Sequence, residues 1–405
     1  MPSTPRRAFL AAAAAGIAGC SARLPVGDDA GTTEPADRRV PTTYRPASDE
    51  WLRPTRSFAN DVVSPTASPP RERPEERWTA PTPGPVHAVV VADGVVYAGS
   101  RDGAVAVDLE DGERRWAVDH GRWVSVVDGR CYAVSDDAIY ALEAETGDEA
   151  WRYELDDVVY DLLEVDGTVY CVDRNGLYGL HADTGEFRWL IEADVGRYSA
   201  LARYDGELHW VTRKAYRTFV PDGPARPEER TAITLDGFAS PTSPTAPAIA
   251  EGTIALGGRG TITHGDAAVR TLSSRGVIWH RPFEPAVTTP AILEDRLLVT
   301  GYDNGSDALD ESAVAALDRE TGDPIWETTV SEPVGPPAVG DGLIYVGGAH
   351  PSEPAEETGH LFALEAETGD LRWELETDGS FAGHPLALVE DVIVLGTRQG
   401  VVVLE

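Results

Sequence analysis

Two neighbouring stretches of the chain hold most of its candidate metal ligands. In the later stretch, His350 and His360 flank three glutamates, Glu353, Glu356 and Glu357. The preceding stretch carries five more oxygen-bearing side chains: Asp303, Asn304, Asp307, Asp310 and Glu311. Oxygen-rich loops can hold calcium, but both stretches lack the ordered ligand spacing of a calcium-binding loop. Because the chain has 68 acidic residues, such clusters also arise by chance. We therefore predict no metal site and keep calcium as the alternative.

Other catalytic patterns are absent from the sequence. The nine histidines are scattered without metal-ligand spacing. There is no nucleophile elbow, phosphate-binding loop or dinucleotide fingerprint. The sequence thus predicts no catalytic residues.

Two short motifs are candidates for other roles. Asn304-Gly305-Ser306 matches the acceptor pattern for N-glycosylation, which makes Asn304 a candidate for modification. The stretch 213–217 (Arg-Lys-Ala-Tyr-Arg) is the most basic part of the chain outside its first residues. We interpret it as local neutralisation of surrounding carboxylates, with an anion or partner contact as the alternative.

The first residues predict export and a lipid anchor. Arg6 and Arg7 precede a short, Ala-rich apolar run, which is typical of a signal peptide. The arginine pair with the following Phe-Leu resembles a twin-arginine signal. Residues 17–20 (Ile-Ala-Gly-Cys) resemble a lipobox, in which the Cys20 thiol is lipidated after removal of residues 1–19; an ordinary signal with a chance cysteine is the alternative.

The composition of the chain indicates the salt environment in which it works and excludes one class of binding partner. The formal net charge is −34, and Lys214 is the only lysine. Such an acidic surface repels itself in dilute buffer and is tolerated where salt screens it, so we predict a high-salt, haloarchaeal origin. Nucleic acid is excluded as a partner because phosphate binding needs a basic face.

Residues 20–74 predict a disordered tether. Pro, Thr, Ser, Asp and Arg dominate this segment, and it offers few regular apolar positions to offset the entropy of ordering. The remaining cysteines, Cys131 and Cys171, occupy non-equivalent positions in neighbouring repeats. We predict two buried thiols and leave a disulfide open.

From residue 75 onward the chain is periodic. In the clearest unit, 337–377, four short apolar strands are joined by an Asp341-Gly342 hairpin turn, a longer loop and a Thr-Gly turn. A tryptophan follows most of these turns, and the spacing of the tryptophans counts the repeats: Trp78, Trp116, Trp151, Trp189, Trp279, Trp326 and Trp373. In the unit from Ser199 to Leu235, the fourth strand, near Arg230 to Leu235, carries no tryptophan.

The two ends of the periodic region complement one another. Residues 401–405 match the third strand of a unit, and residues 76–79 match an isolated fourth strand. Pairing them closes a ring and removes exposed sheet edges. We therefore predict an all-β, eight-bladed β-propeller of four-stranded antiparallel blades over residues 75–405, with the tryptophans packed between blades.

The segment 141–151 (Ala-Leu-Glu-Ala-Glu-Thr-Gly-Asp-Glu-Ala-Trp), repeated in similar form at 363–373, resembles the Trp-docking repeat of the pyrroloquinoline-quinone-type propellers. That superfamily includes quinoprotein dehydrogenases and the non-catalytic propeller lipoprotein of the bacterial outer-membrane assembly machinery. The resemblance implies, for the dehydrogenases, a quinone held with calcium, an Asp, an Arg and two adjacent cysteines. This chain has no adjacent cysteine pair.

The functional expectation follows from these observations. We expect a non-enzymatic propeller, anchored by lipid to the outer face of the cytoplasmic membrane, that binds a cell-envelope protein as a scaffold. The loops between the second and third strands lengthen in three consecutive units, at 259–266, 303–312 and 349–359, and loops on rigid scaffolds are favoured binding surfaces. A quinone-dependent dehydrogenase, or a quinone-binding relative, is the alternative.

Overall fold

A computed structural model describes residues 50–405 apart from 55–56, 58, 61, 196–198, 213, 224, 236–242, 260–267, 274–275, 283–285, 303–311, 333, 349–357 and 379–380. All described residues belong to one compact unit. Every regular element among them is a β-strand. The expected all-β fold is confirmed for this part of the chain.

Four consecutive stretches of chain each fold into a four-stranded antiparallel sheet. Their strands are β7 (Trp123–Val127), β8 (Arg130–Val134), β9 (Ala138–Glu143) and β10 (Glu149–Glu154); β11 (Asp161–Val165), β12 (Thr168–Val172), β13 (Gly176–His181) and β14 (Phe187–Glu192); β15 (Ser199–Tyr204), β16 (Glu207–Thr212), β17 (Ala215–Asp222) and β18 (Ala225–Thr234); and β20 (Ala248–Ala250), β21 (Thr253–Leu256), β23 (Ala268–Ser273) and β24 (Gly276–Pro282).

The later sheets follow the same plan with additions. One sheet comprises β25 (Ala286–Val287), β26 (Ala291–Ile292), β27 (Arg296–Tyr302), β28 (Ser312–Asp318) and β29 (Pro324–Val330). The next sheet comprises β30 (Ala338–Gly340), β31 (Leu343–Gly348), β32 (Thr358–Glu365) and β33 (Leu371–Asp378). The short strand β1 (Val63–Ser64) is added to this sheet beside β30. A two-stranded sheet joins β19 (Ser243–Pro244) to β22 (Gly258–Arg259).

The N-terminal and C-terminal strands of the periodic region share one eight-stranded sheet. Its order is β2 (Glu76–Pro81), β36 (Gly400–Leu404), β35 (Val392–Thr397), β34 (Phe381–Val389), β3 (Val86–Ala92), β4 (Val95–Ser100), β5 (Gly103–Asp108) and β6 (Arg114–Val118). Within it β2 pairs antiparallel with β36, and Trp78 lies opposite Val403.

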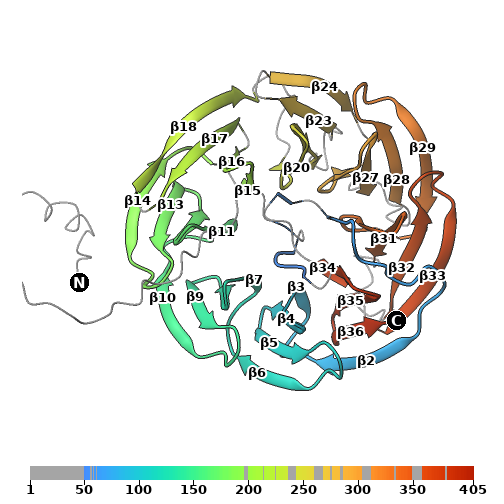
Figure 1. Cartoon of the computed structure of the whole chain (residues 1–405), viewed down its shortest axis with the longest axis horizontal. Helices are drawn as coiled ribbons and strands as arrows, with labels where there is room; N and C mark the ends of the chain where they lie inside the picture. The colour runs from blue at the N-terminus through green and yellow to red at the C-terminus, as the bar shows by residue number, and fades with distance from the viewer. Residues whose placement is uncertain are drawn as a thin grey trace, which may run out of the picture. The chain divides into compact units, whose positions relative to one another are not determined.

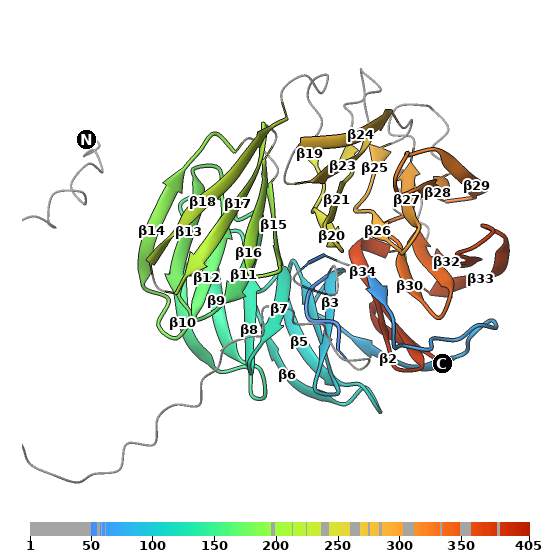
Figure 2. The same ribbon diagram turned by 45° about the horizontal axis from the view of Figure 1, so that its top comes forward.

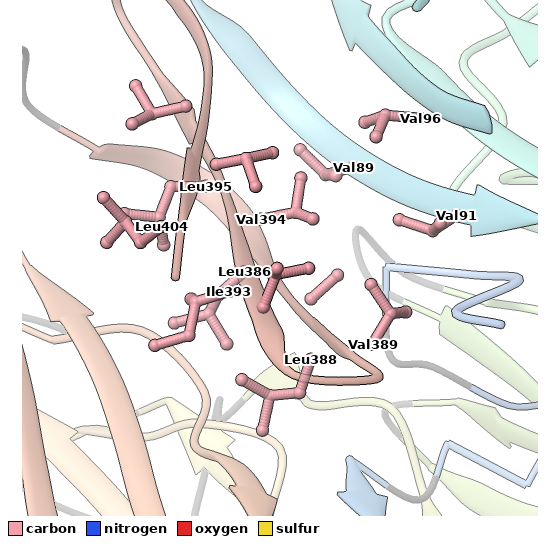
Figure 3. Close-up of a cluster of buried hydrophobic side chains, with 14 of the residues drawn as sticks. Val89, Val91, Val96, Leu386, Leu388, Val389, Ile393, Val394, Leu395 and Leu404 are labelled. Carbon is pink, nitrogen blue, oxygen red and sulfur yellow. The ribbon is translucent and has the colours of Figure 1, made fainter. Parts of the chain in front are cut away.

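The sheets lie around a common centre, as in a β-propeller (Figure 1). The first strand of each sheet, such as β3, β7, β11 or β15, lies innermost, and the last, such as β6, β10, β14 or β18, lies on the outside (Figure 1). The core is built where successive four-strand repeats of the chain meet. Val89 of β3 and Val394 of β35, for example, are fully buried in one cluster (Figure 3).

The predicted hairpin turns adopt the backbone that their residues favour. Asp166 and Gly167, which join β11 to β12, have φ angles of 50° and 74°. Two successive positive φ angles define the turn whose twist matches that of the flanking strands. Five other Asp-Gly or Glu-Gly turns share this geometry, beginning at Asp93, Asp128, Asp205, Glu251 and Asp341.

The predicted disordered tether is wrong for its C-terminal part. The described residues of 50–71, which we call the central strap, belong to the folded body, where Trp51 and Val62 are almost completely buried. The dark-blue ribbon of the strap runs through the centre of the ring (Figures 1 and 2). The composition misled because the apolar surface that covers these residues is provided by strands distant in sequence, not by the segment itself.

Candidate functional site

The central strap hydrogen-bonds to the innermost strands of several sheets. At its start, Trp51 and Val91 of β3 exchange two backbone hydrogen bonds, of 2.6 and 2.7 Å. The carbonyl of Leu52 accepts from the backbone N–H of Val126 in β7, at 3.1 Å. These bonds use N–H and C=O groups that face the centre of the ring, where an unpaired polar group would be costly.

An ion pair joins the strap to a third sheet. The Nη2 atom of Arg53 lies 2.6 Å from Oδ1 of Asp161, at the start of β11, and the Arg53 side chain is only 5% exposed. The Asp161 carboxylate also accepts from the backbone N–H groups of Leu162 and Leu201, at 2.8 and 2.7 Å. A buried guanidinium is thereby paired with a partly buried, hydrogen-bonded carboxylate, as buried ions require.

An amide in the strap bridges two further sheets. Asn60 is fully buried, and its Nδ2 atom donates to the carbonyls of Leu201 and Pro247, at 2.9 and 3.0 Å. Its Oδ1 atom accepts from Nη1 of Arg53, at 3.3 Å. Asn60 has a φ of 54°, a left-handed conformation that asparagine tolerates better than most residues. Arg53, Asn60 and Asp161 therefore form one connected buried network.

The strap leaves the centre along the last sheets of the chain. β1 pairs in parallel with β30, so that Val63 lies opposite Val339. Further on, the backbone N–H of Ser68 donates to the carbonyl of Glu390, at 2.6 Å, and the Tyr345 hydroxyl donates to the carbonyl of Pro70, at 3.1 Å. The strap is thus fixed at both ends.

The described residues at the centre do not fit a quinone cofactor. The arginine and carboxylate that could contact one, Arg53 and Asp161, are bonded to each other. A cavity between Trp51, Val62 and Leu386 has about 20 Å³ of free volume, room for about one water molecule. A small-molecule site needs roughly 300 Å³ or more. We therefore derive no chemistry through a quinone.

The predicted tryptophans contact the next repeat along the chain in a uniform way. In five of them the indole Nε1 atom donates to the carbonyl three residues before the glycine of the next turn: Trp78 to Leu109, Trp116 to Ala144, Trp151 to Ala182, Trp279 to Arg319 and Trp326 to Ala366. The glycine is required because a Cβ atom on Gly147 would lie 2.8 Å from the ring of Trp116.

Two tryptophans depart from this pattern. Trp189 of β14 faces the sheet of β15–β18, whose fourth strand carries no tryptophan. The buried Nε1 atom of Trp189 has no hydrogen-bond partner. Trp373 of β33 donates to the carbonyl of Arg71 in the strap, at 3.2 Å. The strap thus supplies the acceptor that a turn supplies elsewhere.

A buried carboxyl group lies in the second of the four-stranded sheets described first. Glu164 of β11 is 6% exposed; its Oε1 atom accepts from the N–H of Gly167, and its Oε2 atom has no partner. Burial raises the pKa of Glu164 to about 7, and the nearby carboxylates of Asp128 and Asp166 add to the rise. No sequence motif signals this group, because a single Glu in a strand is expected to face solvent.

Comparison with known proteins identifies the family to which these repeats belong. The family model described as outer membrane protein assembly factor BamB matches residues 101–219 and 310–405, more than half of the chain. The chain belongs to the BamB family. No curated protein matches its sequence.

Solved structures with the same fold include both BamB and enzymes. The crystal structure of BamB from Moraxella catarrhalis is 14% identical, with a TM-score of 0.64 over 82% of this chain and 99% of that one. Quinohemoprotein alcohol dehydrogenase from Comamonas testosteroni is 12% identical, with a TM-score of 0.65 over 88% and 80%. A europium-containing methanol dehydrogenase is 14% identical, with a TM-score of 0.60 over 88% and 89%. At such identities the likeness extends to the fold alone.

Several predicted site residues of this BamB-family chain fall outside the described residues. They are Arg6, Arg7, Cys20, Asn304, His350 and the acidic residues of 303–311 and 353–357. His360 is described, and its Nδ1 atom lies 2.8 Å from Oε1 of Glu374. The described ranges contain no cluster of three or more His, Cys, Asp or Glu residues that could hold a metal, nor any helix long and apolar enough to cross a membrane.

The structure describes both cysteines and most of the basic stretch that the sequence singled out. Cys131 and Cys171 are buried free thiols, as predicted. In the basic stretch, Lys214 pairs with Asp194, and Arg217 lies 3.4 Å from Glu229. These pairs fit local neutralisation. The central network of Arg53, Asn60 and Asp161 was not predicted, since Asp161 lies 108 positions from Arg53 and the strap carries no repeat motif.

Proposed function

We propose that this BamB-family chain is a non-enzymatic, exported scaffold that binds a cell-envelope protein. The observation that carries the proposal is the filled centre of the ring, where the strap occupies the innermost strands and pairs the charges Arg53 and Asp161. Catalysis on a small molecule needs a pocket with free polar groups. The family description names an assembly factor, and a role in assembling or holding a partner is consistent with it.

The proposal includes an eight-bladed ring anchored by lipid. In it the eight-stranded sheet counts as two blades, β3–β6 and β34–β36 with β2, and the pairing of β2 with β36 closes the ring. Cys20 carries the lipid after export through the signal that contains Arg6 and Arg7. A Cys20→Ser variant should then appear in the soluble fraction of the cell envelope, while unchanged retention in the membrane would refute the anchor.

The partner surface is proposed on the face from which the loops between second and third strands leave. Because strands alternate in direction, these loops lie opposite the hairpin turns. Arg101, Asp136 and Arg174 are exposed on this face, and Glu110, Asp128 and Glu145 are exposed on the turn face. The two sets provide matched positions for comparison.

Site-specific photo-crosslinking in cells tests the partner surface. A photoreactive residue is placed at each of these six positions in the full-length protein. We expect one discrete crosslinked partner from the loop face and none from the turn face. Crosslinks that are equal on both faces, or absent from both in a folded protein, would contradict the proposal.

A further inference from the structure

We propose that the innermost strands of the ring form a binding site for an extended, arginine-bearing peptide segment, which the central strap occupies in the resting protein. This inference deepens the proposed scaffold function and rests on it. A partner segment with the same chemistry would bind by displacing the strap. The site therefore recognises an extended chain rather than a folded surface.

The ring offers backbone groups suited to an extended chain. The N–H groups of Ile249 and Val339 donate to carbonyls of the strap, at 3.0 and 2.9 Å, and the N–H and C=O of Val91 pair with Trp51. β1 adds to β30 as a parallel strand. Strand addition of this kind supplies affinity through the main chain and leaves specificity to side-chain subsites.

One subsite selects a guanidinium group. The carboxylate of Asp161 is held by the backbone N–H groups of Leu162 and Leu201, so it is oriented independently of the strap. Arg53 fills this subsite with its side chain 5% exposed. A ligand without a cation here would leave a largely buried carboxylate unpaired, which is strongly unfavourable.

A second subsite selects a side-chain amide. The carbonyls of Leu201 and Pro247 both accept from Nδ2 of Asn60. Two carbonyls that converge on one nitrogen favour a donor with two N–H groups, and a carboxylate would be repelled. The site thus recognises an Arg followed several residues later by an Asn or Gln.

The strap is bound in a way that allows exchange. No described sheet needs the strap to complete its strands, since β1 is an added strand beside β30 and leaves β30–β33 paired without it. The indole Nε1 of Trp51 is buried without an acceptor, and a small cavity separates Trp51 and Val62 from Leu386. Unpaired donors and voids weaken an interface, so the resident segment is not an optimal ligand.

The test uses the full-length protein and a fluorescent synthetic peptide of residues 50–66. The double variant Arg53→Ala/Asn60→Ala weakens the resident strap. We expect the peptide to bind this variant saturably by fluorescence anisotropy and to bind the wild type at least about tenfold more weakly, because the strap competes in cis. Adding Asp161→Asn to the double variant should reduce affinity at least about tenfold, while the exposed control Glu154→Gln should not.

Absence of saturable peptide binding by the folded double variant would overturn the proposal. If that variant does not fold, hydrogen exchange on the wild type decides: the N–H of Trp51 should exchange faster than the N–H groups between β3 and β4. Equal exchange would show that the strap opens only on global unfolding and would also overturn it. Quinone titrated into the same samples separates the two hypotheses, since quinone binding contradicts the scaffold function and a failure of peptide binding alone does not.

Discussion

The indole nitrogen of Trp373 donates a hydrogen bond to the carbonyl of Arg71, 302 positions earlier in the sequence, at 3.2 Å. The equivalent nitrogen of Trp326 donates to Ala366, in the turn of the following sheet. A tryptophan at the equivalent position of the repeat therefore links two sheets in the case of Trp326, and links a sheet to the strap in the case of Trp373. This relationship makes the strap part of the contact between the sheets of β33 and β36.

Replacing Trp373 by Phe should loosen the strap, because it removes the hydrogen bond to Arg71. We expect a loss of about 1 kcal/mol or more in the free energy of unfolding, with faster hydrogen exchange at the N–H of Ser68. Trp326→Phe is the matched control and should destabilise the protein by a similar amount without changing exchange at Ser68. Identical exchange in both variants would argue against a separate role for Trp373.

Because its indole nitrogen is unpaired, Trp189 should contribute less to the free energy of unfolding than Trp151, its counterpart in the preceding sheet. Trp151 donates to Ala182 at 2.6 Å, whereas the Nε1 of Trp189 has no partner. Chemical denaturation should therefore show that Trp151→Phe costs at least about 1 kcal/mol more than Trp189→Phe. Equal losses would mean that packing alone, and not the hydrogen bond, sets the contribution of these tryptophans.

Glu164 should make stability depend on pH in the neutral range. Its pKa is raised from 4.5 to about 7 in the folded protein, so its contribution to stability is complete below pH 4.5 and is lost as the pH rises through 7. Glu164→Gln should be more stable than the wild type at pH 8, by up to about 3 kcal/mol. The two proteins should converge near pH 4.5; a constant difference across this range would rule out titration of Glu164.

Deleting residues 75–82 should destabilise the protein, because β2 pairs with β36 and Trp78 contacts Leu109. We expect the thermal midpoint to fall by roughly 10 °C, as for a loss of about 4 kcal/mol. Deletion of eight residues from the N-terminal segment, 21–28, is the length-matched control and should leave the midpoint unchanged. If both deletions behave alike, β2 does not close the ring.

Much of the fold could be predicted because its determinants are local and repeated. The turn at Asp166-Gly167 is specified by two adjacent residues, and Trp116 and Gly147 recur at similar spacing along the chain. The central strap has no such signal. Arg53 meets Asp161, and Asn60 meets Leu201, across 108 and 141 positions, and a Pro-rich segment looks disordered until the strands that bury it are in place.

The same reasoning explains the candidate site. Trp189 faces a unit whose turn at Asp222-Gly223 departs from the Thr-Gly pattern, but whether its nitrogen finds an acceptor depends on which carbonyl lies nearby in the fold. The raised pKa of Glu164 depends first on its burial by the folded strands and then on the charges of Asp128 and Asp166 in nearby hairpin turns. Such properties arise from tertiary contacts and are invisible to patterns of spacing.

Titration of pyrroloquinoline quinone with calcium into the full-length protein in molar salt tests the central claim most directly. Calorimetry and the absorbance of the quinone report binding independently. Because the strap fills the centre and pairs Arg53 with Asp161, the scaffold account predicts no saturable binding by the folded protein. Saturable one-to-one binding would contradict it and direct attention to a dehydrogenase activity.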